Sequence, residues 1–135
     1  MSLVLDCSVA IAWLFEDEAT RETEALAEQV AAAGAIVPSL WRLEIANVLL
    51  QAEKRGRLPA GGAGVRLEVL SDLPIVVDPQ TDVRAWRETL TLARAHGLTV
   101  YDAAYLELAL RKGLPLATRD AALIAAARVA SVALA

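Results

Sequence analysis

The segment Leu3-Val4-Leu5-Asp6-Cys7-Ser8 places three apolar residues directly before an acid. Such a short, uninterrupted apolar run predicts a strand that is buried on both faces, and we expect it to span residues 2–6. Similar runs recur at 35–38, 74–77 and 114–117. Longer stretches with helical spacing separate these runs, so the alternation predicts a parallel sheet covered by helices on both faces.

The expected fold is therefore α/β, a three-layer α/β/α domain whose mostly parallel sheet has four to five strands, with residues 130–134 as the possible fifth. A chain of 135 residues suits a single domain that covers 1–135. Ser39 is the expected N-cap of one helix, and Thr99 opens another. The expected helices cover residues 8–15, 20–33, 39–54, 63–72, 81–96, 99–112 and 120–128.

The composition favours a compact domain over a disordered or exported one. Hydrophobic residues make up 56% of the chain and charged residues 22%, which allows a sizeable core. The N-terminus lacks a basic segment and an acid interrupts its apolar run, which argues against a signal peptide. A single cysteine excludes an internal disulfide, and no apolar tract is long enough to span a bilayer. We expect a cytoplasmic protein that does not enter a membrane.

The net charge of −4 neither requires nor excludes a nucleic-acid partner. Many of the acids are concentrated in the first 40 residues, where Arg21 is the only base. In the rest of the chain the bases slightly outnumber the acids. Nearly all the bases are arginines, and arginine pairs with phosphate better than lysine does.

Two acids follow strands of the expected sheet. Asp6 ends the first strand, and Asp120 comes shortly after the fourth. In open parallel sheets ligands bind beyond the carboxyl ends of the strands, so both acids are expected at one rim. Each acid also has a purely structural interpretation, Asp6 as a turn residue and Asp120 as a helix N-cap.

A third acid, Asp102, lies in the first turn of the helix that begins near Thr99. Its neighbours on the helix surface include Tyr105, whereas Glu107 and Arg111 form the polar face on the opposite side. A carboxylate on the core-facing side needs a partner, because an unpaired buried charge is costly. The alternative is a structural carboxylate that binds backbone N–H groups of the first turn.

The fourth acid, Glu44, lies on a helix that is apolar almost all round. Together with Asn47 and Gln51 it forms one narrow polar strip at helical spacing. The strip either faces solvent, which this helix alone favours, or faces a polar cleft at the rim of the sheet.

Four converging acids would repel one another and raise some pKa values unless a cation were bound between them. Mg²⁺ and Mn²⁺ prefer carboxylate and water oxygens. One cysteine and one histidine cannot build a zinc site. The residues therefore favour Mg²⁺ or Mn²⁺ as the cofactor of such a site.

The four acids lie in short segments that together resemble a known set of motifs. Residues 3–8, 43–47 (Leu-Glu-Ile-Ala-Asn), 101–105 (Tyr-Asp-Ala-Ala-Tyr) and 117–120 (Ala-Thr-Arg-Asp) are similar, in this order, to the four motifs of PIN-domain nucleases. The length and the motif spacing are most similar to those of VapC-type toxins of bacterial and archaeal toxin–antitoxin pairs. The resemblance implies a Mg²⁺- or Mn²⁺-dependent endoribonuclease, often a homodimer, that a cognate antitoxin holds inactive.

The same resemblance implies roles for individual residues. Ser8 and Thr118 become supporting hydroxyls near the first and fourth acids, and Asn47 becomes a group that contacts a ligand and not the metal. The glycine-rich stretch at 60–64 departs from the short helix that such toxins carry there. The implied catalytic groups and metal ligands are the four acids, Asp6, Glu44, Asp102 and Asp120.

Two other functions remain open. A housekeeping RNA-processing nuclease of the same fold would have no antitoxin, and an inactive binding module would keep the fold without the chemistry. The presence of all four acids counts against the binding module. A phosphatase or dehalogenase with an aspartyl nucleophile is excluded, because it needs a second acid two residues after the first and this chain has Ser8 there.

Overall fold

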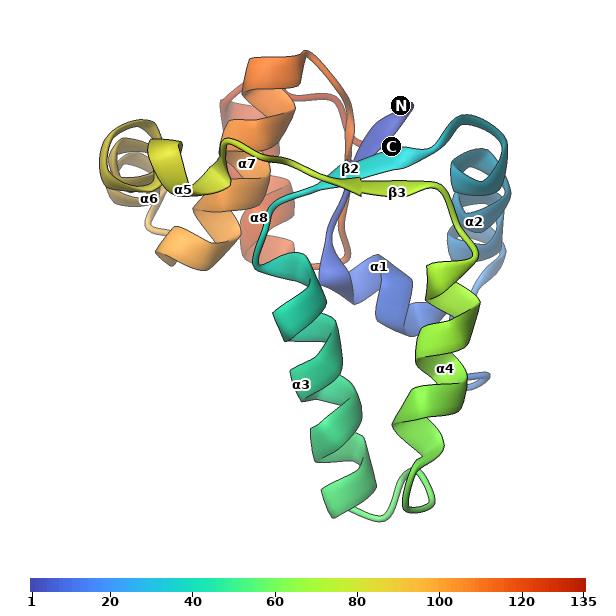
Figure 1. Cartoon of the computed structure of the whole chain (residues 1–135). Helices are drawn as coiled ribbons and strands as arrows, with labels where there is room; N and C mark the ends of the chain where they lie inside the picture. The colour runs from blue at the N-terminus through green and yellow to red at the C-terminus, as the bar shows by residue number, and fades with distance from the viewer.

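The computed structural model describes all 135 residues and contains a four-stranded sheet (Figure 1). The strand order is β3-β2-β1-β4, and every neighbouring pair is parallel. The strands are β1 (Leu3–Leu5), β2 (Ala35–Val37), β3 (Ile75–Val77) and β4 (Leu116–Ala117). All three residues of β1 are fully buried, as expected for a central strand of a covered sheet. The prediction of an α/β fold with a mostly parallel sheet is confirmed.

Helices connect the strands, as crossovers between parallel strands require. Thr20 begins α2 by accepting a hydrogen bond from the Thr23 N–H, and Thr99 begins α7 by accepting one from the Asp102 N–H. Both bonds satisfy N–H groups that are left free at a helix start. The α-helices are α1 (Cys7–Ala12), α2 (Arg21–Ala33), α3 (Trp41–Lys54), α4 (Gly62–Ser71), α5 (Thr81–Arg84), α6 (Leu90–His96), α7 (Val100–Lys112) and α8 (Ala121–Val129).

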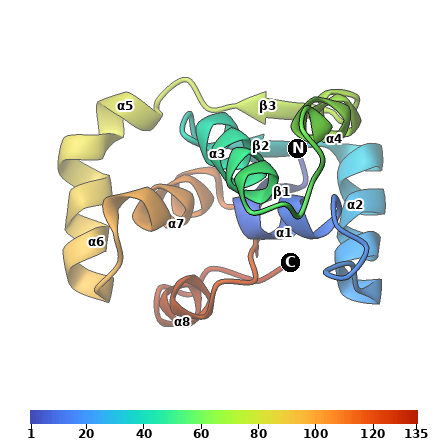
Figure 2. The same ribbon diagram turned by 90° about the horizontal axis from the view of Figure 1, so that it is seen from below.

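Two helices extend away from the rest of the domain. α3 and α4 lie side by side as the arms of a hairpin whose tip is the 55–61 connection (Figure 1). α5, α6 and α7 lie at one end of the sheet and α2 at the other (Figures 1 and 2). None of the helices is both long enough and apolar enough to cross a membrane.

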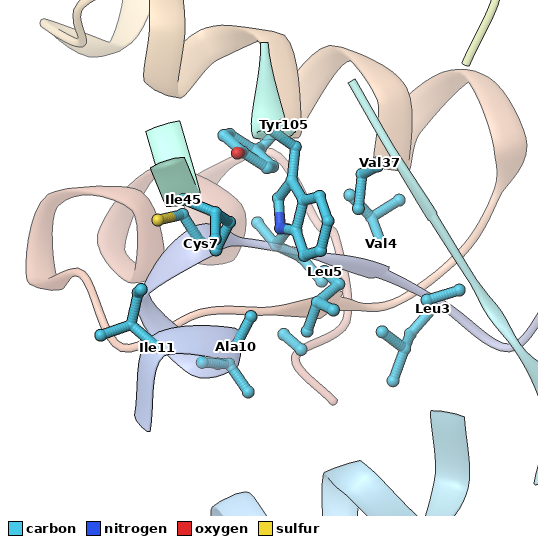
Figure 3. Close-up of a cluster of buried hydrophobic side chains, with 14 of the residues drawn as sticks. Leu3, Val4, Leu5, Cys7, Ala10, Ile11, Val37, Ile45 and Tyr105 are labelled. Atoms are coloured by element: carbon cyan, nitrogen blue, oxygen red, sulfur yellow. The ribbon is translucent and has the colours of Figure 1, made fainter. Parts of the chain in front are cut away.

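The core is one continuous cluster of 29 buried apolar residues. Figure 3 shows part of it, with side chains of β1, α1, α3 and α7 that include Leu5, Cys7, Ile45 and Tyr105. α7 packs against β1 and β4, and it is buried over the consecutive residues 103–109. α7 is therefore a largely buried helix that packs against two neighbouring strands of the sheet.

The expected fifth strand is reduced to a single bridge. Leu134 pairs in parallel with Leu116, and the Leu116 N–H donates to the Ala133 carbonyl over 2.8 Å. α8 runs to Val129, and Ser131 turns the chain with a φ of 60°. Because α8 and the turn at Ser131 include most of the residues expected in the fifth strand, too few remain to form one, and the sheet has four strands.

Ser39 is not the N-cap of α3. Leu40 occupies that position and makes no side-chain capping bond. The Ser39 backbone N–H donates to Thr81 Oγ1 over 3.1 Å, and the Ser39 hydroxyl bonds to Asp82 Oδ1 over 3.2 Å. A tertiary contact with α5 thus replaces the local cap that the sequence predicts.

The helix expected at 81–96 contains a π-helical segment. Residues 81–84 and 90–96 are α-helical, whereas Ala85–Thr89 form wider π turns. Such a segment rotates the residues that follow it relative to those before it. Val83 in α5 and Trp86 in the π-helical segment are 77% and 88% exposed, so this part of the chain presents large apolar side chains to solvent.

The polar face expected on α7 is not exposed to solvent. Glu107 is 5% exposed, and its carboxylate accepts hydrogen bonds from Arg111 at 2.8 and 3.1 Å. Arg111 also donates to Asp78, directly after β3, at 2.6 and 3.2 Å. We call Asp78, Glu107 and Arg111 the Arg111 triad. In this triad the Arg111 guanidinium forms hydrogen bonds with both buried acids, and so supplies the positive partner that a buried carboxylate needs.

Candidate active site

The four predicted acids come together at the rim where β1 and β4 end. Asp6 directly follows β1, and Asp120 comes shortly after β4. Glu44 and Asp102 lie in the first turns of α3 and α7. All four line one cleft of about 500 Å³, and we call them the carboxylate cluster. The other residues that line the cleft are Cys7, Ser8, Ile11, Glu18, Val48 and Arg119.

Asp6 is the most deeply buried member of the cluster, with 6% of its surface exposed. Its Oδ2 atom accepts hydrogen bonds from the hydroxyls of Ser8 and Thr118, at 2.8 and 2.7 Å. These donors are neutral, and no base forms a salt bridge with any member of the cluster. The cluster therefore concentrates negative charge that the protein itself does not pair.

Ser8 and Thr118 also fix the segment that carries Asp120. The Arg119 backbone N–H donates to Ser8 Oγ at 2.9 Å, and the Asp120 backbone N–H donates to Thr118 Oγ1 at 3.0 Å. Each hydroxyl thus donates to Asp6 and accepts from the 119–120 backbone. The structure places both hydroxyls between the first and the fourth acid.

Two members of the cluster lie at helix starts but differ in what their carboxylates do. Asp120 is the N-cap of α8, and its Oδ2 accepts the Leu123 N–H at 2.9 Å. In α7 the cap is Thr99, whose hydroxyl oxygen accepts the Asp102 N–H at 3.1 Å. The Asp102 carboxylate, unlike that of Asp120, accepts no hydrogen bond from a backbone N–H of its own helix. Asp120 combines capping with its place in the cleft.

Glu44 is half-buried, and the hydroxyl of Tyr105 donates to its Oε1 atom. Tyr105 is fully buried in the core, so this bond holds Glu44 towards the cleft and away from open solvent. Asn47 lies about one turn further along α3, is exposed, and does not line the cleft. The structure therefore brings Glu44 into the cluster and leaves Asn47 outside it.

Asp6 and its neighbour Cys7 both ionise at higher pH than usual. Burial raises the pKa of Asp6, hydrogen bonds from Thr118 and Ser8 oppose this effect, and the charge of Asp120 adds to it. Burial, together with nearby carboxylates, raises the pKa of Cys7 to about 12. Cys7 is therefore a neutral thiol at physiological pH and not a nucleophile.

Glu44 and Asp102 have raised pKa values for similar reasons, and burial is the largest cause for both. For Glu44 the Tyr105 hydrogen bond opposes burial, while the charges of Asp6 and Asp102 reinforce it. For Asp102 the charges of Asp120 and Asp6 reinforce burial. Acids that raise one another's pKa create a strong electrostatic attraction for a cation.

The donor set suits a hard divalent cation, because all candidate ligands are carboxylate oxygens. No three Asp, Glu, His or Cys side chains are arranged so that they could hold one ion by themselves. Mg²⁺ does not need such a cage, since it keeps several waters and binds through one or two carboxylates. The residues present therefore fit a hydrated Mg²⁺ or Mn²⁺ in the cleft.

Sequence reasoning assigned no role to three residues that the structure places at the site, namely Tyr105, Arg119 and Glu18. Tyr105 carries a usable signal, because a buried tyrosine needs a partner for its hydroxyl and this one lies three residues after Asp102 on α7. Arg119 and Glu18 are charged loop residues. Arg119 lies within the fourth motif segment, residues 117–120, whereas no sequence pattern separates Glu18 from ordinary solvated charges.

Comparison with known proteins identifies the family of this chain. The PIN-domain family model matches residues 3–129. Ribonuclease VapC3 from Pyrobaculum aerophilum is 32% identical over 120 residues, which cover 89% of this chain and 90% of the relative. The crystal structure of PAE2754 from the same organism has a TM-score of 0.70 at 26% identity, over 93% of this chain and 84% of that one. A toxin–antitoxin complex from Klebsiella pneumoniae has a TM-score of 0.60 at 19% identity, over 88% and 87%. The chain belongs to the PIN-domain family and, within it, to the VapC ribonucleases.

Proposed function

We propose that this protein is a Mg²⁺- or Mn²⁺-dependent endoribonuclease that acts as the toxin of a toxin–antitoxin pair. The observation that carries the proposal is the carboxylate cluster, in which four acids from four segments line one cleft and none is paired with a base. Such a cleft repels RNA phosphates unless a divalent cation is bound in it. Membership of the VapC ribonucleases supports the same function.

The proposed cation ligands and catalytic groups are Asp6, Glu44, Asp102 and Asp120. When bound, the cation supplies positive charge for the scissile phosphate and lowers the pKa of the attacking water. Ser8 and Thr118 both bond to Asp6 Oδ2 and so fix the orientation of that carboxylate. Tyr105 orients Glu44 through its hydroxyl. The ligands are thus held in position before substrate binds, which limits the reorganisation needed for the reaction.

Incubation of the purified protein with single-stranded RNA tests the nuclease function. We expect cleavage with Mg²⁺ or Mn²⁺ and none in EDTA. The products should carry 5′-phosphate and 3′-hydroxyl ends, because water and not the 2′-hydroxyl attacks the phosphorus. A circular RNA should be cut as well, since an endonuclease needs no free end. Full activity in EDTA would contradict the proposal.

The toxin role requires an antitoxin, and the α3–α4 hairpin offers a surface for one. An apolar groove of about 410 Å³ runs between these helices, and apolar surface of this kind is typical of a protein interface. The structural neighbour from Klebsiella pneumoniae was solved as a toxin–antitoxin complex. The groove is lined by Trp41, Arg42, Ile45, Ala46, Leu67, Leu70, Ser71, Leu73 and Ile75.

Co-expression with the product of a small neighbouring gene tests the toxin role. We expect a stable complex in which RNA cleavage is lost. Without that partner we expect a homodimer, because Val83 and Trp86 leave further apolar surface uncovered. Light scattering measures both assemblies. An active monomer that no neighbouring gene product binds or inhibits would favour the housekeeping nuclease instead.

A further inference from the structure

Arg119 is the only base that lines the cleft of the carboxylate cluster. The lining includes five acids, and Glu18 is the one outside the cluster. RNA is a polyanion, and arginine binds phosphate through two parallel N–H bonds. On the basis of the ribonuclease function proposed above, we infer that Arg119 binds an RNA phosphate next to the scissile one and that Glu18 competes with this phosphate for Arg119.

The backbone of Arg119 is held in a fixed relation to the proposed catalytic groups. Its N–H donates to Ser8 Oγ at 2.9 Å, and the Ser8 hydroxyl donates in turn to Asp6. Thr118 and Asp120, on either side of Arg119, are themselves bonded within the site. The Arg119 side chain is 41% exposed. A phosphate that it binds therefore lies within one side-chain length of the cluster.

Glu18 is held in place by a different arginine. Its Oε2 atom accepts a hydrogen bond from Arg57 at 2.7 Å, and Arg57 also binds Asp17 and lies over the Phe15 ring, 3.9 Å from its centre. In contrast, Glu18 Oε1 is 3.7 Å from Arg119 Nη1, which is too long for a hydrogen bond. Arg57 thus keeps Glu18 beside the cleft, while Arg119 is bound loosely enough for a phosphate to replace Glu18.

Two measurements on a short single-stranded RNA test the inference, namely steady-state cleavage in Mg²⁺ and binding by fluorescence anisotropy, also in Mg²⁺ but in an Asp102→Asn background in which we expect cleavage to be slow. We expect Arg119→Gln to raise KM and Kd about tenfold, with kcat within about twofold of the wild-type value. Arg119→Lys keeps the charge but not the two-bond geometry, so its KM should be intermediate. Arg128→Gln is the matched control. It removes the same charge at an exposed position in the last turn of α8 and should leave KM unchanged.

Glu18→Gln tests the competition. If a phosphate replaces Glu18 at the Arg119 side chain, the effect of Glu18 on RNA binding depends on Arg119. We therefore expect Glu18→Gln to lower KM about threefold in the wild-type background and to leave KM unchanged in the Arg119→Gln background. A general repulsion between Glu18 and RNA would lower KM equally in both. That result would overturn the competition between Glu18 and the phosphate.

Equal KM and Kd for Arg119→Gln and Arg128→Gln would overturn the binding role of Arg119, as would a fall in kcat at unchanged KM. Folding of each variant is checked by its melting temperature, which should stay at the wild-type value because Arg119 forms one long surface contact through its side chain. A wild-type protein that cuts no RNA would contradict the proposed function. The anisotropy comparison would then still decide whether Arg119 binds RNA.

Discussion

Helix α7 contributes to two charged clusters that differ in how their charge is balanced. At its first turn, Asp102 belongs to the carboxylate cluster, in which none of the four acids forms a salt bridge. In its later turns, Glu107 and Arg111 form the Arg111 triad with Asp78, and the guanidinium bonds to both acids. The same helix therefore carries an acid without a base, Asp102, in its first turn and an acid paired with a base, Glu107, in its later turns.

The acids of the two clusters have pKa values shifted in opposite directions. Burial raises the pKa of Asp102, and neighbouring acids raise it further. Burial would also raise the pKa of Asp78, but hydrogen bonds from Arg111, from the Gln80 N–H and from Thr81 outweigh it and hold that pKa below its usual value. Burial of an acid does not by itself indicate a functional site, whereas an acid near other acids and without a base does.

The contrast between the two clusters predicts its largest effect for Asp102→Asn, on the rate of RNA cleavage. Asp102→Asn keeps the shape of the side chain and removes its charge, so we expect RNA cleavage in Mg²⁺ to fall about a hundredfold or more. Asp72→Asn makes the same change at an exposed acid outside both clusters, and this control should cleave RNA at the wild-type rate. A fully active Asp102→Asn protein would remove Asp102 from the site.

In the Arg111 triad we expect a loss of stability and not of activity. Arg111→Met leaves Asp78 and Glu107 buried without a base, and the free energy of unfolding should fall by about 3 kcal/mol. Urea denaturation measures this change, with Arg94→Met at an exposed position as the control. Cleavage per folded molecule should stay at the wild-type level. If the Arg111→Met protein were as stable as wild type, the contrast between the two clusters would be lost.

A smaller effect concerns the hydroxyl that links Asp6 to the 119–120 segment. Thr118→Val removes the donor to Asp6 and the acceptor of the Asp120 N–H. We expect the free energy of unfolding to fall by about 1.5 kcal/mol, because these partners are left unsatisfied. Thr118→Ser keeps the hydroxyl and should cost less. Equal urea midpoints for the two variants would show that the methyl group, and not the hydroxyl, matters.

The smallest effect is on the stability of the metal-free protein. Because the pKa of Asp102 is raised in the folded state, its ionisation opposes folding. After solvent screening, we expect Asp102→Asn to raise the free energy of unfolding in EDTA by about 1 kcal/mol at neutral pH. Mg²⁺ should then stabilise this variant less than wild type. A lower melting temperature in EDTA than that of wild type would instead assign Asp102 a structural role.

The pH dependence of these melts separates the two clusters further. When a carboxyl group has a raised pKa in the folded state, the protein loses stability as the pH rises from the ordinary pKa of that group to its raised pKa. The advantage of Asp102→Asn should therefore be absent at acid pH, grow through that window and stay constant above it. The lowered pKa of Asp78 acts in the other direction, since its contribution is present at neutral pH and lost as the pH falls through the lowered value. An advantage of Asp102→Asn that did not change with pH would contradict this explanation.

Signals from neighbouring residues were sufficient to predict much of the fold and part of the site. Four apolar runs became the four strands, and Thr99 begins α7 as expected. The rule that ligands bind beyond the carboxyl ends of parallel strands placed Asp6 and Asp120 at one rim, and the structure has both in one cleft. These inferences use only local sequence and the geometry of a sheet.

Contacts between distant segments were not predictable. Ser39 has the residue type of an N-cap yet bonds to α5, which begins 42 residues later. Glu107 was expected on an outer polar face, because nothing in α7 signals that Asp78 will meet Arg111 from 33 residues away. Helical spacing shows which residues share a face, and it does not show what that face will contact.

The strand order has a consequence for how the protein is made. β1 is synthesised first but lies between β2 and β4, and β4 is the last strand to be synthesised. Asp6 meets Thr118 across 112 residues, and contacts of such long range form late in folding because a large loop must close first. A growing chain on the ribosome therefore has Asp6 without Thr118 and without Asp120. The cleavage site proposed above therefore has all four of its acids only after translation has passed residue 120.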